Sequence, residues 1–456
     1  MNFLNDIKSL SPYFSKTYSK IKRLICKTEI FTLILMLTGF LGLSQDTYVP
    51  DDNFEQALID LEFDDVLDDY VVTANISGIS YLNVSNKGIS DLTGIEDFLG
   101  LEILDCQDNQ LSSLDLSPNP DLFILRCYNN QLTSLDVTQN PALEVLYTNF
   151  NMLTSLDVSQ NSMLRLFECA FNQLTSLDIT QNPALLQFIC SHNQLTSLDV
   201  TQNDVLIQLS CNDNQITAID VTQILGLEIL NVFQNELANL DVTQNTLLND
   251  LDCSFNNLMA LDVSQNEALL LLSCRANQIT GLEVSQSNDL IELSCSSNEI
   301  TNLDVSQNTV LTYLSCRFNQ LTSLNVKNGN NSNFSDFRAD NNSNLTCIEV
   351  DNEAYATTNW TDIDAQTSFS EDCDALSIVD LELNESIMVY PNPASDIINI
   401  EAPQQILYVE VFNMLGKKMK HIAMSNRIDV NALHTGIYLV KIVTDKGQIT
   451  KKISVK

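Results

Sequence analysis

Carboxylates and thiols are the groups in this sequence that could do chemistry, and both recur every 21 residues. One column is acidic at ten successive positions: Asp115, Asp136, Asp157, Asp178, Asp199, Asp220, Asp241, Asp262, Glu283 and Asp304. Carboxylates about 4.8 Å apart on neighbouring strands disfavour each other's ionisation or attract cations. Calcium takes several such oxygen ligands. The column lacks the Gly-rich D-x-D loops of dedicated calcium solenoids, so we expect solvated acids and no metal site, with calcium as the alternative.

Acid–base catalysis by these carboxylates is the second chemistry to consider. A glycosidase needs a pair of carboxyl groups with different pKa values, and a uniform column gives no reason for such a difference. The repeats hold one histidine, His192, and the chain has no G-x-S-x-G, H-E-x-x-H or phosphate-binding loop. We therefore expect no catalytic residues and no enzyme activity.

Nine of the 12 cysteines share one column: Cys106, Cys127, Cys169, Cys190, Cys211, Cys253, Cys274, Cys295 and Cys316. Thr148 and Val232 occupy the two remaining positions of that column. A site that accepts small side chains of this kind suits a buried thiol, which behaves as a small hydrophobe. The spacing also lacks the close pairs of a zinc site. We expect reduced thiols in the core.

Cys347 and Cys373 lie outside this column, just past the last clear repeat. Export to an oxidising compartment makes a disulfide between them plausible. It would close a loop of roughly 25 residues and contribute about 3 kcal/mol.

The 21-residue spacing comes from a unit that begins with Leu and repeats eleven times from Leu101. Each unit has two halves of the form L-x-x-L-x-apolar-x-x-N, such as Leu101 to Asn109 and Leu111 to Asn119. Apolar residues two apart indicate a strand, so we expect two short strands per turn. The first Asn column has no gap: Asn109, Asn130, Asn151, Asn172, Asn193, Asn214, Asn235, Asn256, Asn277, Asn298 and Asn319. The second is interrupted at Ile224, Ser287 and Gly329.

A period of 20 to 29 residues with L-x-x-L-x-L/C-x-x-N is typical of leucine-rich repeats. The nested halves between Ile79 and Val326 resemble the bacterial class called IRREKO. This resemblance implies a mainly β, right-handed parallel solenoid of residues 79–326, in which the Asn side chains bond the turn backbones. Such a solenoid offers a long surface for binding.

Both ends of the repeats change pattern, which indicates caps. In residues 45–78, Phe54, Ala57, Leu58 and Leu61 fall at helical spacing, so we expect a short helical N-terminal cap. Residues 327–373 read as a degenerate last repeat and a C-terminal cap that contains Trp360, and residues 374–386 as a linker.

Residues 1–44 have the pattern of a signal peptide. A basic segment precedes a short apolar run from Ile30 to Leu43, and a small residue, Ser44, suits cleavage. A retained membrane anchor is the alternative, but the apolar run is short for a span. We expect a mature protein without a membrane span.

Residues 387–456 carry three motifs: VYPNPASDIINI, VEVFNMLGKKM and IDVNALHTGIYLVKIVTDKG. Together they resemble the type A C-terminal sorting domain of the type IX secretion system of Bacteroidetes. The resemblance implies a small immunoglobulin-like β-sandwich, recognition by the type IX secretion machinery, and release or attachment outside a Gram-negative cell. An ordinary β-sandwich module is the alternative.

The charge of the chain is −37 and is uneven. Residues 46–384 hold 51 Asp and Glu against 7 Lys and Arg, whereas residues 385–456 hold 6 against 9. An acidic body repels phosphate backbones, so nucleic acid is not an expected partner.

Comparison of the repeats suggests where a ligand binds. The two outward columns of the first strand vary, whereas those of the second half repeat Ser and Asp. Varied chemistry suits recognition, although an unselected surface also drifts. The predicted binding residues are Arg126, Tyr128, Tyr147, Glu168, Ile189, Phe233, Arg275 and Arg317. Phe150, Phe171, Phe255 and Phe318 form a further column directly before the first Asn, where we expect packing under the turn.

The sequence thus predicts a secreted or surface-exposed protein that binds an extracellular protein or glycan without catalysis. The alternative is a structural component of a surface layer, stiffened by calcium.

Overall fold

The computed structural model describes residues 45–373, 387–414, 416–423, 425–445 and 447–456. It divides into two compact units, residues up to 299 and residues 300–456, which are described separately. The expected signal peptide (1–44) and linker (374–386) lie outside the described residues.

The first unit begins with the predicted helical cap. Strands β1 (Asp46–Tyr48) and β2 (Tyr70–Val72) pair antiparallel around helix α2 (Asp52–Asp60), and the short helix α3 (Thr73–Ile76) follows. The side chain of Asp51 caps α2 by accepting hydrogen bonds from two backbone N–H groups of its first turn. The predicted helix is present, with Phe54, Ala57 and Leu58 buried and Leu61, at its C-terminal end, exposed.

Eleven three-residue strands follow in this unit, one per turn, and each pairs in parallel with the next. They are β3 (Tyr81–Asn83), β4 (Ile103–Asp105), β5 (Ile124–Arg126), β6 (Val145–Tyr147), β7 (Leu166–Glu168), β8 (Gln187–Ile189), β9 (Gln208–Ser210), β10 (Ile229–Asn231), β11 (Asp250–Asp252), β12 (Leu271–Ser273) and β13 (Glu292–Ser294). A 3-10 turn, η1 (Ile95–Asp97), lies between β3 and β4.

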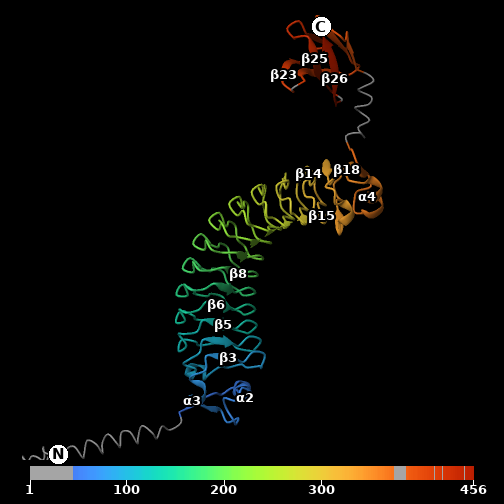
Figure 1. Cartoon of the computed structure of the whole chain (residues 1–456). Helices are drawn as coiled ribbons and strands as arrows, with labels where there is room; N and C mark the ends of the chain where they lie inside the picture. Colours follow the sequence, from blue (N-terminus) through green and yellow to red (C-terminus); the bar gives the residue numbers. More distant parts are fainter. Residues whose placement is uncertain (1–44, 374–386, 415, 424, 446) are drawn as a thin grey trace, which may run out of the picture. The chain divides into compact units, whose positions relative to one another are not determined.

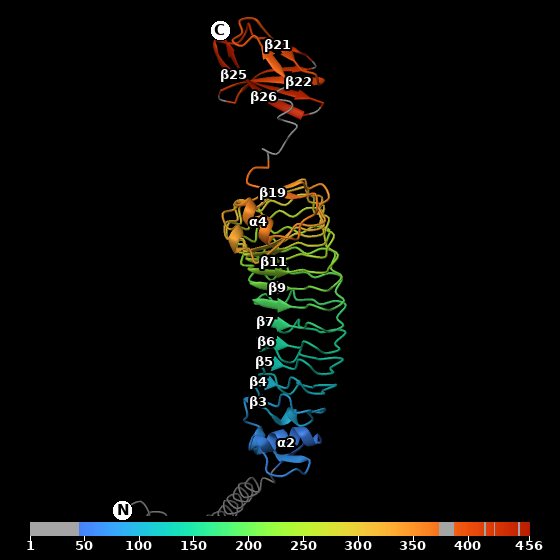
Figure 2. The same ribbon diagram turned by 90° about the vertical axis from the view of Figure 1, so that its right-hand side faces the viewer.

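The register confirms the repeat length read from the sequence. Ile103 pairs with Ile124, a step of 21 residues, whereas Tyr81 pairs with Ile103, a step of 22 in the longer first turn. Equivalent residues of successive turns therefore lie beside each other and form columns. The strands lie one above another along one side of the stack (Figures 1 and 2).

Leucine and cysteine columns fill the interior of each turn. In one turn, Leu122, Leu125, Cys127 and Leu132 have no exposed surface, and the same columns are buried in the other turns. All nine cysteines of the column are buried and form no disulfide, as predicted. Thr148 and Val232, in the same column, are buried as well.

The first Asn column joins each turn to the turn before it. The Nδ2 group of Asn172 donates to the carbonyl oxygens of Thr148 (3.0 Å) and Cys169 (3.1 Å), and its Oδ1 accepts from the N–H of Leu153 (2.9 Å). The pattern recurs from Asn109 to Asn298, for example at Asn130. The predicted role of these side chains is confirmed.

The second Asn column is buried more deeply. Asn182 donates to the carbonyls of Val158 (2.9 Å) and Asn161 (2.8 Å), but its Oδ1 has no hydrogen-bond partner. Ile224 occupies the same column and is fully buried. The stack therefore tolerates an apolar residue at a position in this column.

The prediction of two strands per turn is wrong for most of the first unit. In the second halves, pairing is limited to isolated bridges that join Asp115 to Asp136 and Asp136 to Asp157. The backbone there is satisfied locally instead, since Asp136 accepts hydrogen bonds from the N–H and the hydroxyl of Thr138.

The second unit contains the last repeats and the C-terminal cap. Strands β14 (Asn302–Asp304), β16 (Ser323–Asn325), β18 (Cys347–Glu349) and β19 (Ser368–Ser370) form one parallel sheet, and β15 (Tyr313–Ser315) pairs with β17 (Asp336–Arg338). Helix α4 (Glu353–Asn359) and a 3-10 turn, η2 (Asn331–Asn333), complete the cap. Trp360 stacks on Phe337 at 4.1 Å between ring centroids. The predicted disulfide between Cys347 and Cys373 is present.

Residues 387–456 form two antiparallel sheets. One contains β20 (Met388–Tyr390), β21 (Ile397–Glu401) and β24 (Arg427–Asp429), and the other β22 (Ile406–Asn413), β23 (Lys418–Ala423), β25 (Gly436–Thr444) and β26 (Gly447–Val455). Side chains of both sheets, including Ile398, Val409 and Val440, share one core. The predicted small β-sandwich is confirmed.

The roles of the two Asn columns can be compared by substitution. Asn172→Ala removes four hydrogen bonds and leaves buried carbonyl and amide groups without a partner, so we expect the free energy of unfolding to fall by about 2–4 kcal/mol. Asn182→Ile copies the residue found at Ile224 and should cost less. Urea unfolding followed by circular dichroism measures both. Equal losses in the free energy of unfolding would contradict the expectation that the first Asn column contributes more to stability than the second.

Candidate binding surface

The outward side chains of the first strand define the candidate surface. In each turn they occupy the first and third residues of the strand and the residue two further along, such as Ile124, Arg126 and Tyr128 beside strand β5. We call these three columns the first-strand surface. The middle residue of every strand from β4 to β13 is buried, and most flanking residues are half-exposed.

The structure brings four of the predicted binding residues into direct register. Arg126 pairs with Tyr147, Tyr147 with Glu168, and Glu168 with Ile189 across strands β5 to β8. Tyr128 lies two residues beyond Arg126 and is half-exposed. Phe233 and Arg275 lie further along the first unit, and Arg317 belongs to the second unit.

The sequence reasoning missed one of the three columns of this surface, the one formed by the first residue of each strand. It begins with four half-exposed apolar residues, Ile103, Ile124, Val145 and Leu166, and continues with Gln187. The signal was present in the sequence, because the second variable position of L-x-x-L is aliphatic in four successive repeats. These residues add apolar area beside Arg126 and Tyr147.

Polar contacts hold several of these side chains in place. Arg126 forms a salt bridge of 2.7 Å with Asp105, whose other oxygen accepts a hydrogen bond from the Tyr81 hydroxyl. Glu168 accepts a hydrogen bond from Asn149 (2.6 Å). Burial, together with the nearby carboxylate of Glu168, raises the pKa of Tyr147, so its hydroxyl is protonated at neutral pH. The surface is pre-ordered, which lowers the entropic cost of binding.

Cations in the later turns contact aromatic rings. Arg275 lies over Phe255 at 5.4 Å from the ring centroid, and Phe233 contacts the same ring edge-on at 5.2 Å. Within the second unit, Arg317 lies over Phe318 at 5.0 Å and forms a salt bridge of 2.8 Å with Asp340.

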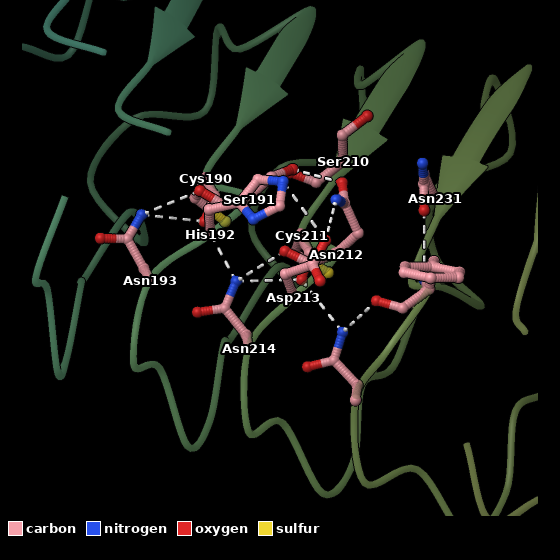
Figure 3. Close-up of polar contacts among 12 residues, drawn as sticks. Cys190, Ser191, His192, Asn193, Ser210, Cys211, Asn212, Asp213, Asn214 and Asn231 are labelled. Atoms are coloured by element: carbon pink, nitrogen blue, oxygen red, sulfur yellow. Dashed lines mark hydrogen bonds and ion pairs between the residues drawn. The ribbon is translucent and has the colours of Figure 1, made fainter. Parts of the chain in front are cut away.

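The expectation that the Phe column packs under the turn is wrong. Phe150, Phe171, Phe255 and Phe318 are between 41% and 51% exposed. Each has a positive φ, between 53° and 56°, which turns the side chain outward as the chain leaves the strand. His192 lies in the same column, and its Nε2 atom lies 3.3 Å from a carboxylate oxygen of Asp213. Beside it, Ser191 donates a hydrogen bond to Asn212, which donates to Asp213 at 2.7 Å (Figure 3).

The acidic side chains in the second half of each turn accept hydrogen bonds from the backbone that follows them. Hydrogen bonds from the hydroxyl and N–H of Thr138 lower the pKa of Asp136, and Thr180 lowers that of Asp178 in the same way. Each acid thus holds the turn that follows it. Within the described residues, no group of three or more His, Cys, Asp or Glu is arranged to hold a metal ion.

The thiols of the cysteine column are shielded from reaction. Burial raises the pKa of Cys127, Cys211 and Cys316 from 9.0 to about 12. Because the thiolate is the reactive form, these groups are inert while the protein is folded.

Comparison with known proteins identifies the C-terminal domain and the fold of the repeats. Residues 388–456 match the family described as the secretion system C-terminal sorting domain. No curated protein sequence matches the chain closely enough to count as a relative.

Several solved structures share the repeat fold. The functional domain of InlJ from Listeria monocytogenes, described as including a cysteine ladder, is 26% identical, with a TM-score of 0.62 over 91% of this chain and 100% of that one. A leucine-rich-repeat protein from Leptospira interrogans is 24% identical (TM-score 0.51, 66% and 85% covered). An internalin from Listeria monocytogenes, InlF, is 21% identical (TM-score 0.53, 60% and 91% covered).

The chain combines a leucine-rich-repeat solenoid with a secretion-system sorting domain. The sorting domain indicates export to the cell surface or beyond, and a leucine-rich-repeat solenoid is typically a non-catalytic binding scaffold. In the described part of this leucine-rich-repeat protein, we found no helix with the length and apolar character needed to span a membrane.

Shielding of the thiols predicts a pH dependence of stability. The unfolded thiols ionise above about pH 9, whereas the folded ones stay protonated to about pH 12. Their contribution to the free energy of unfolding is therefore complete below pH 9 and is lost as the pH rises from about 9 to about 12. We expect the melting temperature to fall above pH 9, and to fall less steeply in Cys211→Val, which copies Val232. An identical slope in the variant would contradict this explanation.

Proposed function

We propose that this leucine-rich-repeat protein recognises an extracellular protein or glycan through the first-strand surface, without catalysis. The observation that carries the proposal is the contrast between the two sides of each turn. On strands β5 to β8, aromatic, aliphatic, acidic and basic side chains lie in register with one another. In the second halves, the same acids, hydroxyls and amides recur and are occupied in holding turns together.

The composition of the early turns suits a binding site. Tyr128 and Tyr147 are half-exposed and combine apolar area with a polar hydroxyl, as residues that dominate binding energy often do. The aliphatic column of Ile124, Val145 and Leu166 supplies further apolar area beside them. These side chains together favour a ligand that covers several turns.

A structural role in a surface layer is the second candidate. The Asn columns and the regular stack would suit a rigid spacer, because each turn is bonded to its neighbour by side chains as well as by backbone. A spacer would tolerate changes on the first-strand surface, whereas a recognition protein would not.

Paired substitutions separate these two functions. The double variant Tyr128→Ser, Tyr147→Ser should bind at least tenfold more weakly than the wild type to whichever component it recognises on an array of extracellular proteins and glycans. Gln181→Ser, on an exposed second half, is the matched control and should bind normally. Unchanged binding by the double variant, with a normal melting temperature, would show that the ligand binds elsewhere.

Export can be tested independently of the ligand. We expect intact source cells to release peptides of the repeats when treated with protease, from a mature protein that starts near Gln45 and ends before Val389. Deletion of residues 387–456 should retain the protein inside the cell. Mass spectrometry of the mature ends measures the outcome. A protected protein that keeps its last 70 or so residues would refute the export proposal.

A further inference from the structure

One position of the repeat has an unusual backbone conformation in every turn of the first unit. It directly precedes the first Asn, and its ten residues from Asp108 to Ser297 have φ between 51° and 58°. Asn and Asp tolerate this left-handed region, and Asp108, Asn129 and Asp213 fit that preference. Bulky side chains are rare there because the Cβ atom crowds the following carbonyl oxygen. Phe150, Phe171 and Phe255 are therefore exceptions, and the first two lie in successive turns.

These two phenylalanines and His192 stack on one another across three successive turns. The ring centroids of Phe150 and Phe171 lie 4.3 Å apart with planes inclined by 10°, and those of Phe171 and His192 lie 3.9 Å apart with an inclination of 18°. Phe150 is 51% exposed and Phe171 is 41% exposed. We call these three residues the aromatic ridge.

Neither local folding nor core packing accounts for the ridge. The left-handed backbone disfavours phenylalanine, and exposure leaves much of each ring in contact with water. Asn129, one turn earlier, is a residue that meets the backbone requirement without an exposed apolar ring. The fold uses the left-handed backbone in every turn but does not need phenylalanine there, and a residue that costs conformational energy without serving the fold is an indication of function.

We propose that the aromatic ridge docks a basic protein segment, whose Lys or Arg side chains flank apolar ones. This proposal rests on the proposed function, because it names the partner class for the surface next to the first-strand surface. Each ridge residue is the next residue in the chain after a member of the first-strand surface. The pairs are Asn149 and Phe150, Ala170 and Phe171, and Ser191 and His192.

The stacking geometry favours a protein over a glycan. Sugars pack their C–H groups against the flat faces of aromatic rings. Both faces of Phe171 are already covered, one by Phe150 and the other by His192. Between the two end rings, the exposed part of the ridge is a row of ring edges, which fits into a groove between side chains as protein partners provide, and the end ring Phe150 is stacked on Phe171 through one face only.

The charge of the partner follows from the charge of this unit. Residues 46–299 hold 38 Asp and Glu against four Lys and Arg. All four cations are engaged within the unit: Lys87 with Asp60, Arg126 with Asp105, Arg165 with Glu144, and Arg275 over Phe255. Positive charge that balances the surface must come from the partner.

Acidic residues of the same column, before and after the ridge, agree with a basic partner. Asp108 lies two turns before Phe150 in the same column, and Asp213 follows His192. The chain also shows which group covers a phenylalanine of this column, since the guanidinium of Arg275 lies over Phe255. An arginine of the partner can meet Phe150 in the same way.

The test is selection of a random 12-residue peptide library on the mature exported protein. We expect the bound peptides to be rich in Arg or Lys and in apolar residues, and to bind Phe150→Asn, Phe171→Asn at least tenfold more weakly. The control Phe255→Asn should keep the wild-type affinity. Since Asn suits the left-handed backbone, the double variant should melt at or above the wild-type temperature.

Each other outcome overturns the proposal. Selected peptides that are neutral or acidic would refute the partner class, and glycan binding that depends on Phe150 would refute the choice of a protein. A lower melting temperature of the double variant would assign the ridge to packing. Peptides that depend on Tyr128 and Tyr147 but not on the ridge would leave the proposed function standing and remove only this inference. If no peptide, protein or glycan binds, both fail.

Discussion

The bond between one asparagine side chain and two successive turns is the interaction on which the structure depends. A chain that reverses direction every few residues buries backbone carbonyls that no strand partner reaches, and these groups must be satisfied. Asn172 satisfies carbonyls of its own turn and of the previous turn, and it accepts an N–H of that previous turn. Repetition of this arrangement fixes the step at 21 residues, and all columns follow from that step.

Once the step is fixed, each residue meets its own counterpart in the next turn. That rule explains the cysteine column, where a small apolar side chain is accepted but a large one would clash in every layer, and where Thr148 and Val232 fit equally well. It also explains why acids can lie next to acids. Asp157, for example, accepts hydrogen bonds from the N–H and the hydroxyl of Ser159, which lower its pKa although Asp136 and Asp178 act to raise it.

The repeats made most of this fold predictable from the sequence, because eleven copies show which positions are constant. The helical cap, the buried cysteines that form no disulfide, the disulfide itself, the role of the first Asn column and the sorting domain were predicted correctly. Two features were not. The second strand is mostly absent because Asp and Thr bonds satisfy that backbone locally, and Phe150 and Phe171 are exposed because their backbone is left-handed. Apolar residue type alone does not reveal either effect.

The two halves of each turn differ in how far their surfaces can vary. In the second half, side chains such as Asp136 and Asp178 hold the backbone, so a change of residue there would loosen the turn. In the first half, strands β4 to β13 are joined by backbone hydrogen bonds, which place few demands on the outward side chains. Residues such as Arg126, Tyr147 and Ile189 can therefore differ from turn to turn without loss of the fold. Recognition requires that freedom, and within the repeat unit the first-strand surface, together with the adjoining column of the aromatic ridge, is where the fold provides it.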